Sequence, residues 1–343
     1  MSLFGVDTAV HGEGGSGALA PAHPSAPIPV QGPGVGHGVR TPLGDSGIQV
    51  FPLVLGGAEF GWHVDLASSH DIIDRYVDLG GNALHTADSF ASGRSEHIIG
   101  QWLRSRRARD EMTLMIRIGM HPDHPGLGPV SLVRAVEASL SRLGVERIDV
   151  LYLDGASDAV TPLEETLATA EWLVESGKIG QLGAAAFAPE RLVEARILSS
   201  AGYPRISVLD VHYNVLHRSV YEGDMRLVAG AQGLAVTPSH PLEHGFLSGR
   251  HRRRGRTGLS ARGEQLAAYL NRRGQRVLRA LDRVAAEAGV PDAAVAVAWL
   301  LAQRAVVAPI VNAYAPEHVE ELVQGVGMHL TRAQLGELSR AAL

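Results

Sequence analysis

The sequence contains no cysteine among its 343 residues. This absence excludes thiol nucleophiles, cysteine-ligated zinc and disulfide bonds together. Lysine is nearly absent too, since Lys178 is the only one and the other basic residues of that class are arginines. Arginine stays charged at any useful pH and cannot serve as a tunable acid or base. Because Lys178 lies in a predicted helix-to-strand turn, a catalytic lysine is almost excluded as well.

Long apolar runs and an export signal are also missing. No apolar run approaches the roughly 20 residues that a membrane helix needs. The N-terminus has no basic start followed by an apolar stretch, and the net charge of -5 argues against general affinity for nucleic acid. We therefore expect a cytoplasmic protein that acts on a small molecule, with neither a nucleic acid nor a membrane as partner.

The composition is that of a globular chain with a large core. Hydrophobic residues make up 45% and charged residues 20% of the sequence. Residues 1–40 are rich in Gly, Pro, Ala, Ser and His without an apolar period, so we predict a flexible tail there. Residues 41–343 are then long enough for a single α/β barrel.

Short apolar runs alternate with amphipathic stretches from residue 43 onward, which is typical of a parallel sheet with intervening helices. The predicted strands lie near residues 52–57, 81–86, 113–118, 148–153, 180–185, 206–212, 233–238 and 307–311. The predicted helices cover residues 68–79, 95–105, 131–143, 162–176, 189–200, 221–231, 262–288, 292–303 and 316–324. Eight strands in this order predict a (β/α)8 barrel, preceded by an N-terminal β-hairpin, with its site at the C-terminal strand ends.

Three segments at predicted strand ends carry a family resemblance. They read NALHTADSFASGRSE (82–96), LMIRIG (114–119) and IDVLYLD (148–154), and further matches include ESGKIG (175–180) and PLEHGFLSGR (241–250). Over about residues 43–340 the chain resembles the aldo-keto reductases. This resemblance implies a barrel in which Asp, Tyr, Lys and His reduce carbonyls with NADPH.

The four places of that tetrad fall on His85, Phe90, Arg117 and Asp154, and all four differ from the family's residues. Phe90 has no proton to donate, so general acid catalysis from its place is lost. One interpretation is structural, because buried charges need partners and Arg117 can pair with Asp154. The other is a His85–Asp154 dyad for proton transfer, with Arg117 holding an anionic group. Tyr152, the other hydroxyl nearby, is expected to pack inside the barrel.

The resemblance also places cofactor contacts on altered residues. The Ser-Asn pair that grips the nicotinamide carboxamide falls on Ala185 and Ala186, and the accompanying Gln falls on Asp210. Alanine offers no donor or acceptor, and a carboxylate accepts without donating. After the last strand, Leu322 stands where an adenine-binding Asn is common, and the usual basic residue for the 2′-phosphate is missing.

One part of the cofactor machinery is retained in the sequence. The segment PLEHGFLSGR (241–250) still resembles the loop that covers the pyrophosphate, and the basic run RRRGR (252–256) follows it. The candidate cofactor-binding residues are Leu242, Gly245, Leu247 and Gly249. The cofactor is therefore left open, with NADPH as one candidate.

Alternation along the sixth strand places Asp210 and His212 on one face. Together with His85 and Asp154 they form a candidate nitrogen and oxygen cluster of a kind that can hold a divalent metal. Single hydrogen bonds are the alternative, and we assign no metal to the site.

These observations leave three functions. The first, which we predict, is non-redox acid–base chemistry on a small carbonyl or sugar-like metabolite, such as elimination, isomerisation or epimerisation. Its catalytic residues would be His85, Arg117, Asp154 and His212. The second is an NADPH-dependent oxidoreductase with a nonstandard active site, and the third is a noncatalytic barrel that binds a ligand or a protein.

Overall fold

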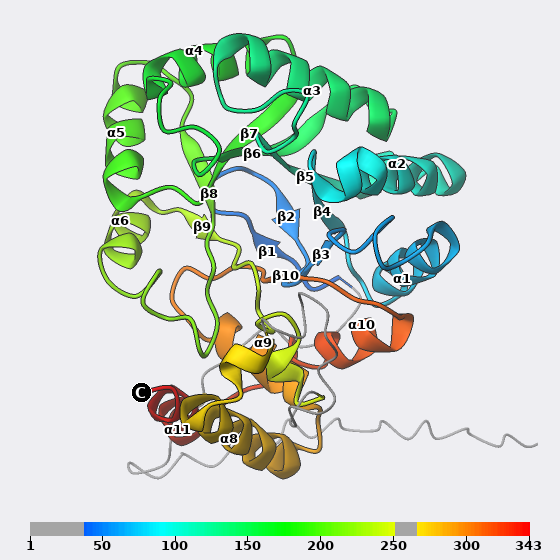
Figure 1. Cartoon of the computed structure of the whole chain (residues 1–343), viewed down its shortest axis with the longest axis vertical. Coiled ribbons are helices and arrows are strands. Elements are labelled where there is room, and N and C mark those ends of the chain that lie inside the picture. Colours follow the sequence, from blue (N-terminus) through cyan, green and yellow to red (C-terminus); the bar gives the residue numbers. More distant parts are fainter. Residues whose placement is uncertain (1–37, 251–265) are drawn as a thin grey trace, which may run out of the picture.

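Eight parallel strands form a ring at the centre of the molecule (Figure 1). The structure is a computed structural model that describes residues 38–250 and 266–343. The strands are β3 (Val54–Gly56), β4 (Ala83–Ala87), β5 (Thr113–Ile118), β6 (Ile148–Asp154), β7 (Ile179–Ala185), β8 (Ile206–Asp210), β9 (Ala235–Val236) and β10 (Ile310–Val311). Of the predicted tail at residues 1–40, only residues 38–40 are described, so that prediction stays untested.

The strand order closes the sheet on itself. The hydrogen-bonded sequence runs β10-β3-β4-β5-β6-β7-β8-β9, and every pair in it is parallel. The remaining gap is bridged where the Val307 N–H donates to the Val236 carbonyl and the Ile310 N–H donates to the Pro238 carbonyl, each at 2.8 Å. The predicted (β/α)8 barrel is confirmed.

Helices surround the ring on its outer side (Figure 1). They are α1 (Leu66–Asp78), α2 (Arg94–Arg106), α3 (Pro129–Leu143), α4 (Leu163–Glu175), α5 (Pro189–Ser200), α6 (Asp224–Gln232), α8 (Arg272–Ala288), α9 (Asp292–Leu301), α10 (Pro316–Val323) and α11 (Arg332–Ala341). Short 3-10 turns are η1 (Phe90–Gly93), η2 (Arg109–Glu111) and η3 (Phe246–Ser248). None of the described helices alone is long and apolar enough to cross a membrane; α8 and α9 pass that test only as a pair, bent by 96°.

The helix predictions differ from the structure at two places. The predicted helix over 262–288 is interrupted at residues 270–271, where Asn271 adopts an extended conformation and its side chain accepts a hydrogen bond from the Gly274 N–H. Residues 262–265 lie outside the described part. Helix α11 was not predicted, although Thr331 and Gln334 form a capping box that marks its start.

Strand alternation separates the apolar residues into two cores. Side chains such as Leu114 and Leu151 point outward and pack beneath the helices. Their neighbours Met115, Val150 and Tyr152 point inward and fill the barrel. The inner core is therefore solid, and only the residues one step further along each strand reach the C-terminal mouth.

The predicted N-terminal hairpin, β1 (Thr41–Pro42) paired antiparallel with β2 (Gln49–Val50), is confirmed. Its residues Leu43 and Val50 belong to the inner core. Asn82, which precedes β4, accepts a hydrogen bond from the Phe51 N–H and donates to the Gln49 carbonyl. The hairpin thus covers the N-terminal end of the barrel and leaves the opposite end for the site.

Close helix packing at Gly100 gives a stability prediction. A Cβ at this position in α2 would lie 2.3 Å from the carbonyl oxygen of Leu143 at the end of α3. Because backbone cannot move aside as a flexible side chain does, we expect Gly100→Ala to lower the free energy of unfolding by about 1–3 kcal/mol in urea denaturation.

The matched control is Gly230→Ala in α6, where an added Cβ meets no atom within 4 Å. Without a clash, the same substitution is expected to raise the free energy of unfolding by about 0.4–1 kcal/mol. Equal effects of the two substitutions would contradict the close approach of α2 and α3.

Candidate functional site

Strand register brings four polar side chains to the inner face of the barrel mouth. Arg117 on β5 lies level with Tyr152 on β6. Asp154 is two residues further along β6, and the register through β7 sets it level with Asp210 on β8. His85 on β4 follows the same alternation as the inner-core residues. Positions far apart in sequence therefore meet at one end of the barrel.

Arg117 and Asp154 form the central ion pair. The Nε and Nη2 atoms of Arg117 lie 2.7 and 2.6 Å from the same carboxylate oxygen of Asp154, which is fully buried. The other Asp154 oxygen accepts a hydrogen bond from the Ala156 N–H. The predicted pairing of these two charges is confirmed, and a buried carboxylate is thereby neutralised.

The predicted His85–Asp154 dyad is not formed. Both oxygens of Asp154 are occupied, by Arg117 and by the Ala156 N–H, and no hydrogen bond joins Asp154 to His85. Nε2 of His85 has no hydrogen-bond partner among the described residues. The dyad prediction was wrong in this respect, because the Arg117 guanidinium donates two hydrogen bonds to the carboxylate in place of His85.

His85 is instead a buried neutral imidazole. Its ring lies between Phe90 and Tyr152, with ring centroids at 6.2 and 5.7 Å and edge-on geometry. Burial, with the positive charge of Arg117 nearby, lowers the pKa of His85 to about 3. At neutral pH the ring therefore has one N–H donor and one acceptor nitrogen. It lacks the second proton that an imidazolium could give up as a general acid.

The two other aromatic positions offer no proton either. Tyr152 is buried in the inner core as predicted, and its hydroxyl is hydrogen-bonded to Thr237 at 2.9 Å. Burial raises the pKa of Tyr152 far above its ordinary value. Phe90 begins η1, where Ala91 and Ser92 both hold left-handed backbone with φ of 50° and 56°. Such backbone in residues other than glycine is strained, and it shapes the wall beside His85.

Asp210 is the second carboxyl that Arg117 faces. Its Oδ2 lies 3.5 Å from Nη1 of Arg117, and its Oδ1 is buried without a hydrogen-bond partner. Burial raises the pKa of Asp210, although Arg117 acts in the opposite direction. The sequence interpretation treated Asp210 as a carboxylate that accepts hydrogen bonds, and burial makes its charged form more costly than it is in water.

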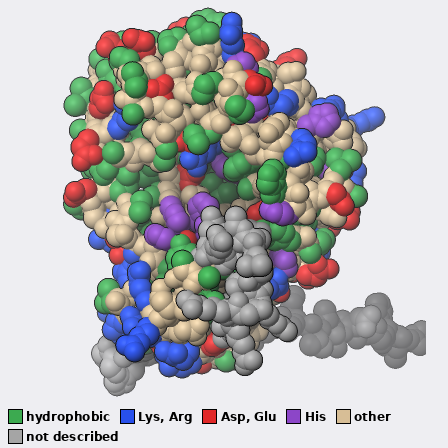
Figure 2. Space-filling view, viewed as in Figure 1, with side chains coloured by type: hydrophobic (Ala, Val, Ile, Leu, Met, Phe, Trp, Pro, Cys, Tyr) green, Lys and Arg blue, Asp and Glu red, His purple; other side chains and the backbone are tan. Residues whose placement is uncertain are grey.

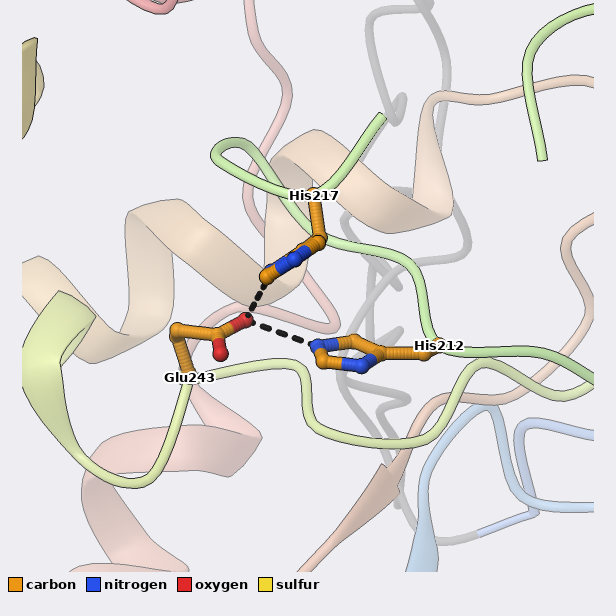
Figure 3. Close-up of side chains that lie close together, drawn as sticks. All are labelled: His212, His217 and Glu243. Atoms are coloured by element: carbon orange, nitrogen blue, oxygen red, sulfur yellow. Dashed lines mark hydrogen bonds and ion pairs between the residues drawn. The ribbon is translucent and has the colours of Figure 1, made fainter. Parts of the chain in front are cut away.

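His212 does not join His85 and Asp154 in a common cluster. Its Nε2 atom lies 2.8 Å from an oxygen of Glu243, and a dashed line marks this contact in Figure 3. Burial would raise the pKa of Glu243, but hydrogen bonds from His212, Tyr269 and Asn214 outweigh it and hold the pKa well below its ordinary value. The contact with Glu243, a buried carboxylate on the loop after β9, was not predicted from the sequence, and the catalytic role of His212 stays a prediction.

A cleft of about 410 Å³ lies beside the barrel mouth. It is bordered by the loop after β9 and by residues that follow β3 and β10, including Glu59, Asn312 and Tyr314. Histidine side chains gather beside a hollow on this face of the molecule (Figure 2). A cleft of this size suits a small ligand or one part of a larger one.

Two of the four predicted cofactor-binding residues line this cleft. Leu242 and Gly245 border it, whereas the side chain of Leu247 is fully buried in the outer core. Gly249 ends η3 in left-handed backbone with φ of 72°. The basic run at residues 252–256 lies outside the described part of the chain.

Sequence reasoning missed two charged groups on the loop after β9. Arg250 lines the cleft and forms an ion pair with Glu321 at 2.6 Å. Glu243 lies within the quoted segment 241–250, but its letter carries no sign that the side chain is buried. The ion pair of Arg250 and the burial of Glu243 both depend on how the loop after β9 packs against its neighbours, which no local sequence pattern reports.

Removal of the central cation should be costly. Arg117→Met leaves Asp154 buried without a counter-charge, so we expect the free energy of unfolding to fall by about 3–5 kcal/mol in chemical denaturation. The double substitution with Asp154→Asn should recover part of this loss. Arg283→Met is the control: it breaks the exposed pair with Glu337 and should cost at most about 1 kcal/mol. A loss at Arg117 no larger than that at Arg283 would contradict a buried pair.

The buried imidazole predicts a pH dependence of stability. The unfolded chain protonates His85 near the ordinary pKa of about 6.5, whereas the folded chain does so only near 3. Between these values the unfolded state binds more protons, so stability falls as the pH falls, by at most about 1.4 kcal/mol per pH unit.

His85→Asn removes this term, and its free energy of unfolding should fall less than that of the wild type between about pH 6.5 and pH 4.5. His97→Gln, which removes an exposed histidine on α2, serves as the control. Urea denaturation across this pH range measures both slopes. A wild-type slope retained in His85→Asn would argue against a buried neutral ring.

Known proteins resemble this chain in sequence over most of its length. A norsolorinic acid reductase of Aspergillus flavus is 26% identical over 314 residues, which cover 86% of this chain and 79% of the relative. An aldo-keto reductase of Emericella nidulans is 30% identical over 317 residues, covering 84% and 78%. A probable voltage-gated potassium channel subunit beta of Oryza sativa subsp. japonica is 28% identical over 270 residues, covering 75% and 81%.

The family model agrees with these relatives. The model of the aldo/keto reductase family matches residues 52–342, which include the whole barrel from β3 to α11. The chain therefore belongs to the aldo/keto reductase family.

Proposed function

We propose that the protein is an oxidoreductase that uses a nicotinamide dinucleotide to interconvert a carbonyl and an alcohol on a small molecule. The observation that carries the proposal is the cleft beside the barrel mouth, bordered by Leu242 and Gly245 of the segment that resembles the pyrophosphate loop. The names of several relatives, which are reductases and a putative aryl-alcohol dehydrogenase, support the same reaction class.

We also propose that the family's tetrad has been replaced in this chain. His85, Phe90, Arg117 and Asp154 stand at its places, and none of them reproduces the residue expected there. The ion pair of Arg117 with Asp154 keeps the charge balance of a buried cation and carboxylate. The proton donor of a tyrosine is missing, so the chemistry must rest on other groups.

Two buried polar atoms fit a ligand at the mouth. Nε2 of His85 and Oδ1 of Asp210 both lack a partner within the described chain, and both belong to the inner face. Buried polar atoms are costly to leave unsatisfied, so a bound molecule with its own donor and acceptor would stabilise this arrangement. The cofactor would lie along the cleft, on the side of the loop after β9, and the substrate would meet these two atoms.

When bound, the cofactor supplies or accepts the hydride. His85, with the proton on Nε2, donates a hydrogen bond to the reacting oxygen and polarises it as a neutral imidazole. The guanidinium of Arg117 adds positive charge beside that oxygen in a water-poor site. Asp210, whose pKa is raised by burial, lies on the same inner face, and we assign it to carry the proton of the reaction.

Fewer observations support the hypothesis of non-redox acid–base chemistry. It relied on a proton transfer between His85 and Asp154, and the two are not hydrogen-bonded. A noncatalytic barrel is supported by the relative named as a potassium channel subunit beta. Both interpretations and the predicted cytoplasmic location stay predictions.

The test is a titration of the full chain with NADPH and NADP+, followed by calorimetry and fluorescence. We expect micromolar binding. Leu242→Glu places a negative charge in the cleft wall and should weaken binding at least about tenfold, since it repels the phosphates. Leu227→Glu makes the same change at an exposed position on α6 and should leave the affinity unaltered.

Turnover separates an enzyme from a binding protein. Oxidation of NADPH should be followed with a panel of aldehydes and ketones, for the wild type and for His85→Asn. We expect the variant to lose about a hundredfold in kcat while its dissociation constant for NADPH is unchanged. No binding up to millimolar cofactor would end the redox proposal, and binding without turnover of any carbonyl would favour a noncatalytic barrel.

A further inference from the structure

Four histidines and one buried carboxylate gather on the loops after β8 and β9. Glu243 is fully buried, and its Oε2 atom lies 2.8 Å from Nε2 of His212 and 3.0 Å from Nδ1 of His217 (Figure 3). The His240 ring is tilted against the His212 ring with 4.7 Å between their centroids, and the His244 ring centroid lies 4.9 Å from that of His240. The cluster is separate from the His85 and Arg117 group that we propose for the reaction.

We propose that His212, His217 and Glu243 bind a divalent transition-metal ion of the zinc type. Their three candidate ligand atoms all lie within 4.8 Å of one another. Two imidazoles and one carboxylate are a common ligand set for zinc, with the remaining coordination position left open. The proposal is independent of the oxidoreductase function, because none of these residues is assigned to that reaction.

Crowding at a single oxygen favours an ion over hydrogen bonds alone. Oε2 of Glu243 faces His212, His217 and also the side-chain nitrogen of Asn214 at 2.5 Å. A carboxylate oxygen has about two lone-pair positions, so three donors on one atom exceed its capacity. A cation between the two rings would replace two of these donors, because each neutral ring would then present its lone pair to the metal.

The Glu243 oxygen needs only a small adjustment relative to the two histidines. With zinc–ligand distances of about 2.0–2.1 Å, the ligand atoms of a tetrahedral site lie about 3.3 Å apart. The present separations of 2.8 and 3.0 Å from Oε2 to the two histidines must open by a few tenths of an ångström. Both rings are partly exposed, with 31% and 37% of their side-chain surface accessible, so they have room to move and a path for the ion.

Neighbouring side chains orient the proposed ligands. Tyr269 donates a hydrogen bond to Oε1 of Glu243 at 2.5 Å, which directs Oε2 toward the histidines. The side-chain oxygen of Asn214 accepts from the His217 N–H at 2.9 Å, and its nitrogen also donates to the His240 carbonyl at 2.9 Å. Such outer hydrogen bonds are typical of metal sites, where they set the direction of each ligand.

A metal at this place would fix one wall of the cleft. Leu242 and His244 flank Glu243 in sequence and line the cleft, whereas His212 and His217 belong to the loop after β8. An ion bound by all three residues would therefore tie the two loops together. Its open coordination position would be available to water or to an anionic group of a ligand.

The test uses the full chain, stripped with a chelator and titrated with Zn2+ by calorimetry. We expect one ion per chain with micromolar or tighter affinity, and a higher midpoint of thermal unfolding when Zn2+ is added. Co2+ as a second probe should give the visible absorption of a low-coordinate site with nitrogen and oxygen ligands.

Variants decide whether the ion binds at this cluster. His217→Phe keeps a ring at a partly exposed position and removes its nitrogens, and Glu243→Gln keeps the shape of the carboxylate. Each should lower the affinity for Zn2+ at least about tenfold and abolish the Co2+ absorption. If Glu243→Gln fails to fold, His217→Phe alone carries the test.

Controls separate this site from adventitious binding. His97→Phe, at an exposed position on α2, should bind Zn2+ as the wild type does. A chain with His11, His23 and His37 all changed to Gln should also keep the site. Unchanged affinity in His217→Phe, loss of binding in the triple variant, or no saturable binding below millimolar Zn2+ would overturn the proposal.

Discussion

The mouth of this barrel depends on a single guanidinium. Arg117 on β5 faces two buried carboxyls, Asp154 on β6 and Asp210 on β8, so one cation links three strands. A buried carboxylate without a partner would be strongly destabilising, and the closest pairing, with Asp154, removes that penalty. The same charge disfavours protonation of His85 and opposes the effect of burial on Asp210. The protonation states of the other groups at the mouth therefore depend on where Arg117 lies.

This arrangement limits the chemistry that the inner face can perform. His85 is neutral, Phe90 has no exchangeable proton, and the Tyr152 hydroxyl is held by Thr237. Polarisation of an oxygen by a neutral imidazole and a nearby cation needs none of the missing groups. For that reason a hydride-transfer reaction with an unusual proton source fits the site better than a histidine–aspartate dyad. The unsatisfied buried atoms at the mouth add support to the proposal, because a substrate or cofactor would complete their hydrogen bonds.

The loops after β8 and β9 form a second polar centre beside the first. The Glu243 carboxylate accepts hydrogen bonds from four side chains, those of His212, Asn214, His217 and Tyr269. The residues on either side of Glu243 border the cleft. The two centres are connected through the end of β8, since Asp210 is the last residue of that strand and His212 lies in the loop that follows it. A ligand in the cleft would thus contact a wall whose position depends on Glu243. The proposed metal site and the proposed oxidoreductase site are neighbours that can be tested separately.

The sequence alone determined the barrel, its hairpin and most helix positions, because apolar periodicity and turn residues report on local geometry. It also placed His85, Arg117, Asp154 and Asp210 at strand ends, and it allowed the pairing of Arg117 with Asp154 as one of two arrangements. Only the tertiary structure decided between them. The register of β5 and β6 places the Arg117 guanidinium against the Asp154 carboxylate, so this carboxylate pairs with the arginine and not with His85. The partnership of His212 with Glu243 was likewise invisible in the sequence. It joins residues 31 positions apart on different loops, and no local pattern encodes such a contact.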